Sequence, residues 1–257
     1  MSSSLGIQKR RMAEGKQFLL VDIGNSYIKS AVYEDDSLLK RISVGKNEVE
    51  KIQNLILNSN IKAILISASG QSKVEYNLQI IFPSIPVFHL HYNQIKEIQF
   101  SYAHPENIGK DRIAAMIGAQ LLRPEKNICV VQAGTCLTID WLFKDGKHLG
   151  GTISPGVRMR FNSMHQFTAK LPLSTENELL GFIGDSTLSC LASGVIYGMV
   201  AEINFQFEAF KNQIGEGAEL ILSGGDVNNL AHRLKPSNFV VHDLVFLGML
   251  KILKSLI

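Results

Sequence analysis

The chain has 257 residues, of which 46% are hydrophobic and 19% charged, so it can bury a substantial core as one large or two modest domains. The formal net charge of +3 comes entirely from residues 1–16, and residues 17–257 are balanced. This balance argues against a basic nucleic-acid-binding face on the fold. Residues 1–16 lack the apolar core of a signal peptide and are predicted to form a disordered basic leader. No run of 18 apolar residues exists, so we expect no membrane-spanning segment.

Hydrophobic periodicity predicts an α/β fold in two similar series. The first series has strands at 18–23, 27–34 and 38–44, a helix near 47–58, a strand at 63–68, a helix near 73–81, a strand at 87–90, and a helix from 111 that ends before Pro124. The second has strands at 128–133, 137–143 and 147–153, a long helix near 186–210, a strand at 219–223 and a last helix near 243–254. This order indicates sheets covered by helices, and we place the lobes at 17–123 and 124–257.

An acid, a glycine, a hydroxyl and a lysine follow directly on the first strand. Asp22 stands at the strand end, where a carboxylate can face a cleft and hold a hydrated Mg²⁺. Gly24 permits a turn with φ > 0, and Ser26 and Lys29 add a hydroxyl donor and a point charge for a phosphate. The pattern predicts a phosphate-binding hairpin. The alternative is a plain β-hairpin with Asn25 in a left-handed turn and Lys29 in solvent.

A second element of the same kind spans residues 127–140, with Gly134 and Thr135 in its turn. Two strand–glycine–hydroxyl–strand units about half a chain apart suggest an internal duplication. We therefore expect two related lobes that present their turns to a common cleft.

The three cysteines lie in apolar or small-residue settings without metal-ligand spacing. Cys129, Cys136 and Cys190 are accordingly predicted to be reduced and buried. Cys136 follows Thr135 and could lie near a bound nucleotide.

The segment at 102–112 leads into the helix that closes the first series. Asp111 and Arg112 fall at the helix N-terminus, where N–H groups and the helix dipole favour anions. In the functional interpretation, Asp111 accepts a hydroxyl proton and Arg112 holds a substrate carboxylate by paired hydrogen bonds. In the alternative, the two residues form a helix cap and a surface ion pair.

Three further segments are rich in glycine or capping residues. Residues 150–156 predict either a wall where a ligand approaches the main chain or an ordinary turn into a helix near Val157. Residues 184–187 open the long helix, and the Thr187 hydroxyl could point into the cleft. Residues 222–226 suit close packing of a nucleotide base or ribose.

Taken in this order, the blocks resemble the type III pantothenate kinase family, within the acetate and sugar kinase, heat-shock and actin superfamily. The resemblance runs from about residue 18 to the C-terminus. It implies duplicated ribonuclease-H-like lobes with mixed sheets covered by helices and an active-site cleft between the lobes. The segments that carry it are 22–29, 109–112, Gly134-Thr135 with Asp140, 150–156, 184–187 and 223–226.

The resemblance implies ATP-dependent phosphorylation of pantothenate to 4′-phosphopantothenate, the first step toward coenzyme A, by a cytoplasmic homodimer that uses Mg²⁺ and K⁺ or NH₄⁺. Asp111 then resembles the proton acceptor, and Asp22 lies on the Mg²⁺ side. The ATP contacts implied are Asp22, Ile23, Gly24, Asn25, Ser26, Tyr27, Ile28, Lys29 and Thr135. The pantothenate contacts implied are Tyr102, Gly109, Lys110, Asp111, Arg112 and Thr187.

Gln132 departs from this pattern. The family usually has an aspartate there, the expected monovalent-cation ligand. A glutamine carbonyl can coordinate K⁺ but brings no negative charge, so the cation site is in doubt.

Two other functions compete with the pantothenate kinase. A non-catalytic regulator of this family would be compatible with Gln132, but it would have no physical need for a proton acceptor beside a phosphate loop. A kinase for another small hydroxyl substrate is also compatible with the superfamily fold. Neither a nucleic acid nor a membrane is expected as a partner.

Overall fold

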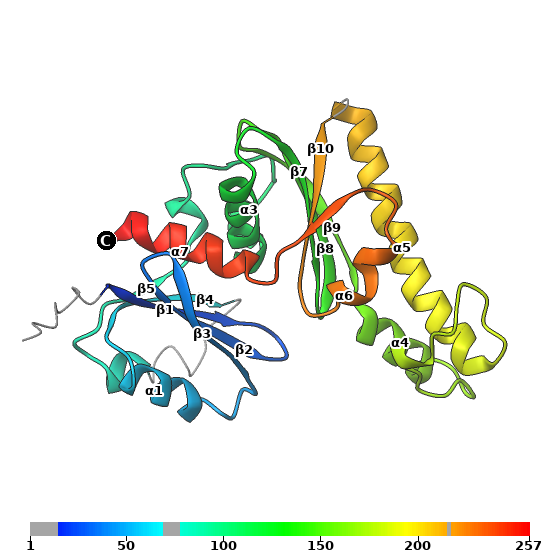
Figure 1. Cartoon of the computed structure of the whole chain (residues 1–257), viewed down its shortest axis with the longest axis horizontal. Coiled ribbons are helices and arrows are strands. Elements are labelled where there is room, and N and C mark those ends of the chain that lie inside the picture. Colours follow the sequence, from blue (N-terminus) through cyan, green and yellow to red (C-terminus); the bar gives the residue numbers. More distant parts are fainter. Residues whose placement is uncertain (1–14, 69–77, 215–216) are drawn as a thin grey trace, which may run out of the picture.

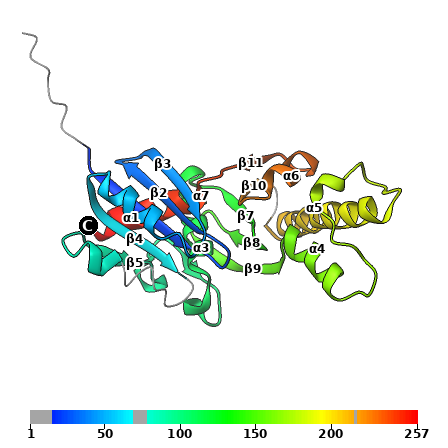
Figure 2. The ribbon, with the colours of Figure 1, turned by 90° about the horizontal axis from the view of Figure 1, so that it is seen from below.

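The computed structural model describes residues 15–68, 78–214 and 217–257. The chain forms two sheets on either side of a central helical layer, as the two views show (Figure 1, Figure 2). The layer consists of α3 (Lys110–Leu122) and α7 (Leu244–Leu256). One core cluster joins side chains of both sheets to both helices.

The first sheet has the strand order β3-β2-β1-β4-β5. β1 to β3 form an antiparallel meander, whereas β4 and β5 run parallel to β1. α1 (Glu50–Leu57) covers the face opposite to the central layer with Ile52, Leu55 and Ile56. Both faces of β1 are covered, which explains its unbroken apolar run. The strands are β1 (Gln17–Ile23), β2 (Ile28–Glu34), β3 (Ser37–Val44), β4 (Ile61–Ala68) and β5 (Val87–His89).

The second sheet has the order β11-β10-β7-β8-β9-β6. β7, β8 and β9 form the meander, and β10 and β11 run parallel to β7. α4 (Val157–Gln166) and α5 (Thr187–Ile214) lie with their apolar side chains in the core on its outer face. The strands are β6 (Gln99–Phe100), β7 (Asn127–Ala133), β8 (Cys136–Leu142), β9 (Lys147–Pro155), β10 (Ala218–Ser223) and β11 (Asn238–Val240).

The register of the two sheets confirms the predicted duplication. Asp22 on β1 pairs with Lys29 on β2 and with Ser67 on β4. Gln132 on β7 holds the same place, paired with Thr138 on β8 and Ser223 on β10. Asp22 and Gln132 are therefore equivalent positions of two related lobes.

Glycines bring α3 and α7 into close contact. A Cβ at Gly118 would lie 2.2 Å from the Leu244 carbonyl oxygen, and one at Gly248 would lie 1.8 Å from that of Ala114. Only glycine permits this approach of two helix backbones. The close packing holds α3, and hence its N-terminus, in a fixed place between the sheets.

Three features of the fold differ from the predicted elements. The two-residue β6 and three-residue β11 are additional, because strands this short carry no periodicity. α5 continues to Ile214 and is long and apolar enough, by length and composition, to cross a membrane. Its buried side chains, among them Ile196 and Met199, pack in the core on the outer face of the second sheet, and this burial accounts for the apolar composition of α5.

The fold does not test two predicted segments and one predicted boundary. Most of the basic leader at 1–16 and most of the helix near 73–81 lie outside the described residues. The boundary between 123 and 124 stays a prediction. Around it, β6 joins the second sheet, and α7 packs against β1 and β4 of the first.

Candidate active site

Alternation along the strands directs two polar residues toward the central layer. Phe18 and Leu20 of β1 pack against α3 and α7, and Asp22 is two residues further on the same face. Ile128 and Val130 of β7 pack against the same two helices from the second sheet, and Gln132 is two residues further on the same face of β7. The two lobes thus present Asp22 and Gln132 from opposite sides.

Asp111 lies in the first turn of α3 and reaches the neighbourhood of Asp22. Burial, and then the negative charge of Asp111, raise the pKa of Asp22 from 3.8 to about 6. Lys29 and a hydrogen bond from the Ser67 hydroxyl, at 3.1 Å, act in the opposite direction. The structure therefore brings together the predicted proton acceptor and the predicted Mg²⁺-side carboxylate, which are 89 positions apart in the chain.

The two glycine turns meet. The Ser26 Oγ and Thr135 Oγ1 atoms are 3.2 Å apart. Lys29 lowers the pKa of Asp226, which burial and Glu176 raise above the usual value, so Lys29 faces the turn after β10. The expected common cleft is thus lined by a hydroxyl from each turn, and Lys29 lies close enough to both Asp22 and Asp226 to lower their pKa values.

The backbone of the first turn corrects two expectations. Gly24 does not have a positive φ, and neither does Asn25. The Gly24 N–H donates to the Tyr27 carbonyl at 3.1 Å, which closes the hairpin. Ile23 and Ile28 are buried in the core between the first sheet and α1, so only their main chain can contact a nucleotide.

Arg112 makes a buried ion pair that sequence reasoning missed. Its Nε and Nη2 atoms donate to the two Asp140 carboxylate oxygens at 2.9 and 2.6 Å. Asp140 also receives a 2.9 Å hydrogen bond from His148 Nε2. Burial alone would raise the pKa of Asp140, but His148 and Arg112 hold it below its usual value. The surface ion pair between Asp111 and Arg112, the alternative considered above, is not what the structure shows.

The glycine-rich segments pack against this site and the second turn. A Cβ at Gly151 would lie 2.7 Å from Asp140 Oδ1 and 2.9 Å from Arg112 Nη2. A Cβ at Gly156 would lie 2.0 Å from the Gly134 carbonyl oxygen. Gly224 has a φ of +109°, and a Cβ there would lie 2.1 Å from the Ala133 carbonyl oxygen. These glycines let the main chain approach the turn and the ion pair.

The predicted substrate residues divide into two places. Gly109 is the N-cap of α3 and Lys110 its first residue, so both lie beside Asp111. Tyr102 is 37% exposed and stacks on His148 near Arg112. Thr187 lies elsewhere, at the start of α5, which the views place at the end of the molecule away from the first sheet (Figure 1, Figure 2).

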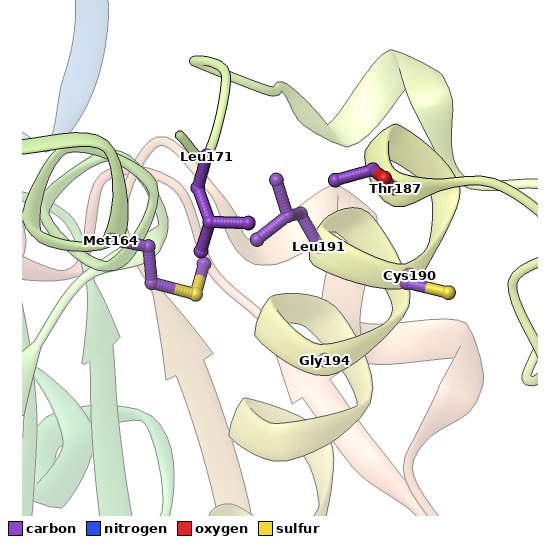
Figure 3. Close-up of a pocket in the computed structure, with 6 residues that line it drawn as sticks. All are labelled: Met164, Leu171, Thr187, Cys190, Leu191 and Gly194. Atoms are coloured by element: carbon purple, nitrogen blue, oxygen red, sulfur yellow. The ribbon is translucent and has the colours of Figure 1, made fainter. Parts of the chain in front are cut away.

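Thr187 borders an open hollow of about 350 Å³ between α4 and α5 (Figure 3). The hollow is apolar, with Met164, Leu171 and Leu191 around it. Cys190 also lines it and is exposed, and Cys136 is half-buried, so the prediction of three buried cysteines holds only for Cys129.

Protein ligands alone do not form a metal centre in the described part of the chain. Within residues 15–68, 78–214 and 217–257, no three His, Cys, Asp or Glu side chains gather suitably for a metal ion. Mg²⁺ in phosphoryl-transfer sites is held by one or two carboxylates together with phosphates and water. A single carboxylate such as that of Asp22 is therefore compatible with Mg²⁺ binding even without a cluster of protein ligands.

Two duplicated lobes, with a hydroxyl-bearing turn from each and a carboxylate at a helix N-terminus between them, define a two-lobed phosphotransferase class. A profile of the type III pantothenate kinase family matches residues 18–209. The Type III pantothenate kinase of Flavobacterium johnsoniae is 36% identical over 237 residues, 88% of this chain and 95% of that protein. The chain belongs to the type III pantothenate kinase family.

Solved structures support the fold. A Campylobacter jejuni protein described as a Baf family transcriptional activator aligns with a TM-score of 0.60 and 23% identity, covering 92% of this chain and 98% of that one. A ROK family glucokinase from Streptomyces griseus, in complex with glucose and AMPPNP, aligns with a TM-score of 0.54 and 12% identity over 92% and 98%. At these identities the likeness concerns the fold alone.

Proposed function

We propose that this chain transfers the γ-phosphoryl group of ATP to the 4′-hydroxyl of pantothenate, the first step toward coenzyme A. The observation that carries the proposal is the placement of Asp111, at the N-terminus of α3, beside Asp22 at the end of β1. Asp111 accepts the proton of the attacking hydroxyl. Ser26, Lys29 and Thr135 hold phosphate oxygens between the two turns.

The residues present fit Mg²⁺. Burial and the charge of Asp111 disfavour the ionised form of the Asp22 carboxylate. The positive charge of a divalent cation would stabilise that form. When bound, Mg²⁺ would neutralise negative charge on the phosphate oxygens. Asp22 would hold it, and Ser67 would keep the Asp22 carboxylate in place by its hydrogen bond.

The residues present fit a monovalent cation less well. Gln132 contributes a neutral amide, and its Nε2 donor is buried without a hydrogen-bond partner among the described residues. Thr138 Oγ1, on the paired position of β8, is in the same state. The Gln132 amide nitrogen cannot coordinate a cation, whereas the Gln132 carbonyl oxygen and the Thr138 hydroxyl oxygen can, but both are neutral ligands. We therefore propose a weak dependence on K⁺ or NH₄⁺.

We also propose a homodimer. Four large apolar side chains near α4 and the start of α5 are exposed by more than two thirds, namely Phe167, Leu180, Phe182 and Ile183. Large apolar side chains exposed to this extent are typical of an interface. A second copy would also reconcile Thr187 with Asp111, since one chain does not bring these two predicted substrate contacts together.

Mixing two inactive variants tests this arrangement. A homodimer of Asp111→Asn or of Thr187→Val has no intact site. In a mixed dimer, one site would combine the native Asp111 of one copy with the native Thr187 of the other. Activity that returns on mixing supports the shared site. A monomer in light scattering, or no activity from mixtures shown to exchange subunits, contradicts it.

The decisive experiment for the function is ADP release from purified protein with ATP and pantothenate, with and without K⁺, and detection of 4′-phosphopantothenate by mass spectrometry. Release that requires another hydroxyl compound would indicate a different substrate. No release at all would favour a regulator, the class named for the Campylobacter jejuni protein. A soluble cytoplasmic enzyme without nucleic-acid partners is the setting we propose.

A further inference from the structure

His148 lies on the strand next to the edge of the second sheet, and its ring contacts Tyr102, one of the predicted substrate residues. It belongs to β9, where it pairs with Phe100 of β6. Its side chain is fully buried. The Phe100 ring meets it edge-on at 5.8 Å, and the Tyr102 ring stacks on it at 6.3 Å with an angle of 18° between the planes. The imidazole is therefore held on two sides by the segment that leads to α3.

The hydrogen bonds of His148 define its tautomer. Nε2 lies 2.9 Å from Asp140 Oδ1, and a carboxylate only accepts, so Nε2 carries a proton. Nδ1 has no hydrogen-bond partner within the described residues. A buried polar atom without a partner destabilises the fold, so a role limited to one hydrogen bond with Asp140 would not favour a histidine here.

Asp140 transmits the orientation of His148 to Arg112. Oδ1 is shared by His148 Nε2 and Arg112 Nη2, and Oδ2 accepts from Arg112 Nε. Two bonds to one edge of the guanidinium fix its plane. The edge formed by Nη1 and Nη2 remains for a second carboxylate, and Tyr102 interacts with the same guanidinium.

We propose that His148 is a positioning residue for the substrate carboxylate. Through Asp140 it sets the plane of Arg112, and through its ring face it sets Tyr102. The inference rests on the proposed function, because it takes the pantothenate carboxylate as the group that Arg112 holds. It predicts that His148 controls the affinity for pantothenate and leaves the nucleotide side, at Ser26 and Thr135, unchanged.

A matched pair of substitutions tests the hydrogen bond. His148→Gln places its amide nitrogen the same number of bonds from the main chain as His148 Nε2, so it can still donate to Asp140. His148→Met has similar size and no donor. We expect His148→Met to raise the KM for pantothenate about ten-fold or more with the KM for ATP within two-fold, and His148→Gln to return it to within about three-fold of wild type.

Trp141→Phe serves as the control for a merely structural effect. Trp141 is next to Asp140 on β8 but points to the other face, where it stacks on Phe210 at 6.2 Å. Its substitution should lower the Tm without separating the two KM values. If His148→Met behaves like Trp141→Phe, or if folded His148→Gln does not restore the KM, the proposal is wrong.

Should His148→Met not fold, His148→Asn replaces it, because its amide is one bond shorter and cannot reach Asp140 in the same geometry. Equal KM values for His148→Asn and His148→Gln would then overturn the proposal. Failure of the proposed function is seen separately, as absence of pantothenate-dependent ADP release in the wild-type protein.

Discussion

The Ser26 Oγ atom lies 3.2 Å from the Thr135 Oγ1 atom, although the two residues are 109 positions apart in the chain. Each belongs to the glycine turn of one lobe, so this hydrogen bond joins the two turns. In the proposed ATP site, nucleotide phosphates between the turns would replace this hydrogen bond. Both hydroxyls then become available to phosphate oxygens.

Thr135→Val and Ser26→Ala should therefore each raise the KM for ATP about 3–10-fold, as expected for the loss of one hydrogen bond to a charged group. The KM for pantothenate should stay unchanged. Thr152→Val is a suitable control, because it removes a buried hydroxyl on β9 that lies outside the cleft face. Steady-state kinetics with each substrate varied in turn gives both constants, and an equal rise in the two would contradict the assignment.

Asp111→Asn should lower kcat about 10²–10⁴-fold, because an amide cannot accept the proton of the attacking hydroxyl. The fold should persist, since Asp111 makes no capping hydrogen bond to α3. Circular dichroism and single-turnover kinetics check the two statements. A variant that keeps more than half of the wild-type kcat would remove Asp111 from the mechanism.

Asp22→Asn should stabilise the protein without ligands while it abolishes activity. The folded-state pKa of Asp22 is raised from 3.8 to about 6, so the folded state binds the proton more tightly and the free energy of unfolding falls as pH rises through this window. The substitution should therefore add about 1–3 kcal/mol at pH 7 and almost nothing at pH 4.

Calorimetry from pH 4 to pH 8 measures this difference. Ser67→Ala is the matched control, because it removes the hydrogen bond to the Asp22 carboxylate and should lower stability at pH 7. A stability gain in Asp22→Asn that does not depend on pH would show that Asp22 is not the titrating group.

Arg112→Lys should raise the KM for pantothenate about ten-fold and more than that for ATP, since lysine has no planar fork to offer a carboxylate. Lysine also cannot replace both bonds to Asp140, so the Tm should fall. Equal increases in both KM values would count against Arg112 as the carboxylate ligand.

Gln132→Asp should strengthen the response to K⁺. A unit charge ~4 Å from K⁺ is worth about 4 kcal/mol at an effective dielectric of ~20 before desolvation, so a net gain of ~1–2 kcal/mol is reasonable. That gain would lower the half-activating K⁺ concentration about ten-fold or more. Gln132→Asn has the same shape without the charge and serves as control. An unchanged half-activating concentration, at fixed ionic strength, would contradict this account.

The sequence by itself determined the longer strands and the two repeated turns that indicate the duplication, because each strand and each turn is a local pattern. The run from Phe18 to Val21 is a strand in any context that buries it, and the repeated turns at Gly24 and Gly134 are visible in the chain. Asp111 could likewise be assigned to a helix N-terminus, since helix starts depend on neighbouring residues. The meeting of the turns followed from the duplication.

Only the tertiary structure decided the partner of Arg112 and the place of Thr187. Asp140 is 28 residues from Arg112, and His148 reaches it through the pairing of β8 with β9, which has a register shift between Trp141 and Leu142. Such pairing depends on the summed packing of two sheets and α3, and no local pattern encodes it. Thr187 follows α4 and a loop to the far end of the molecule, so chain order could not tell that it is separated from Asp111.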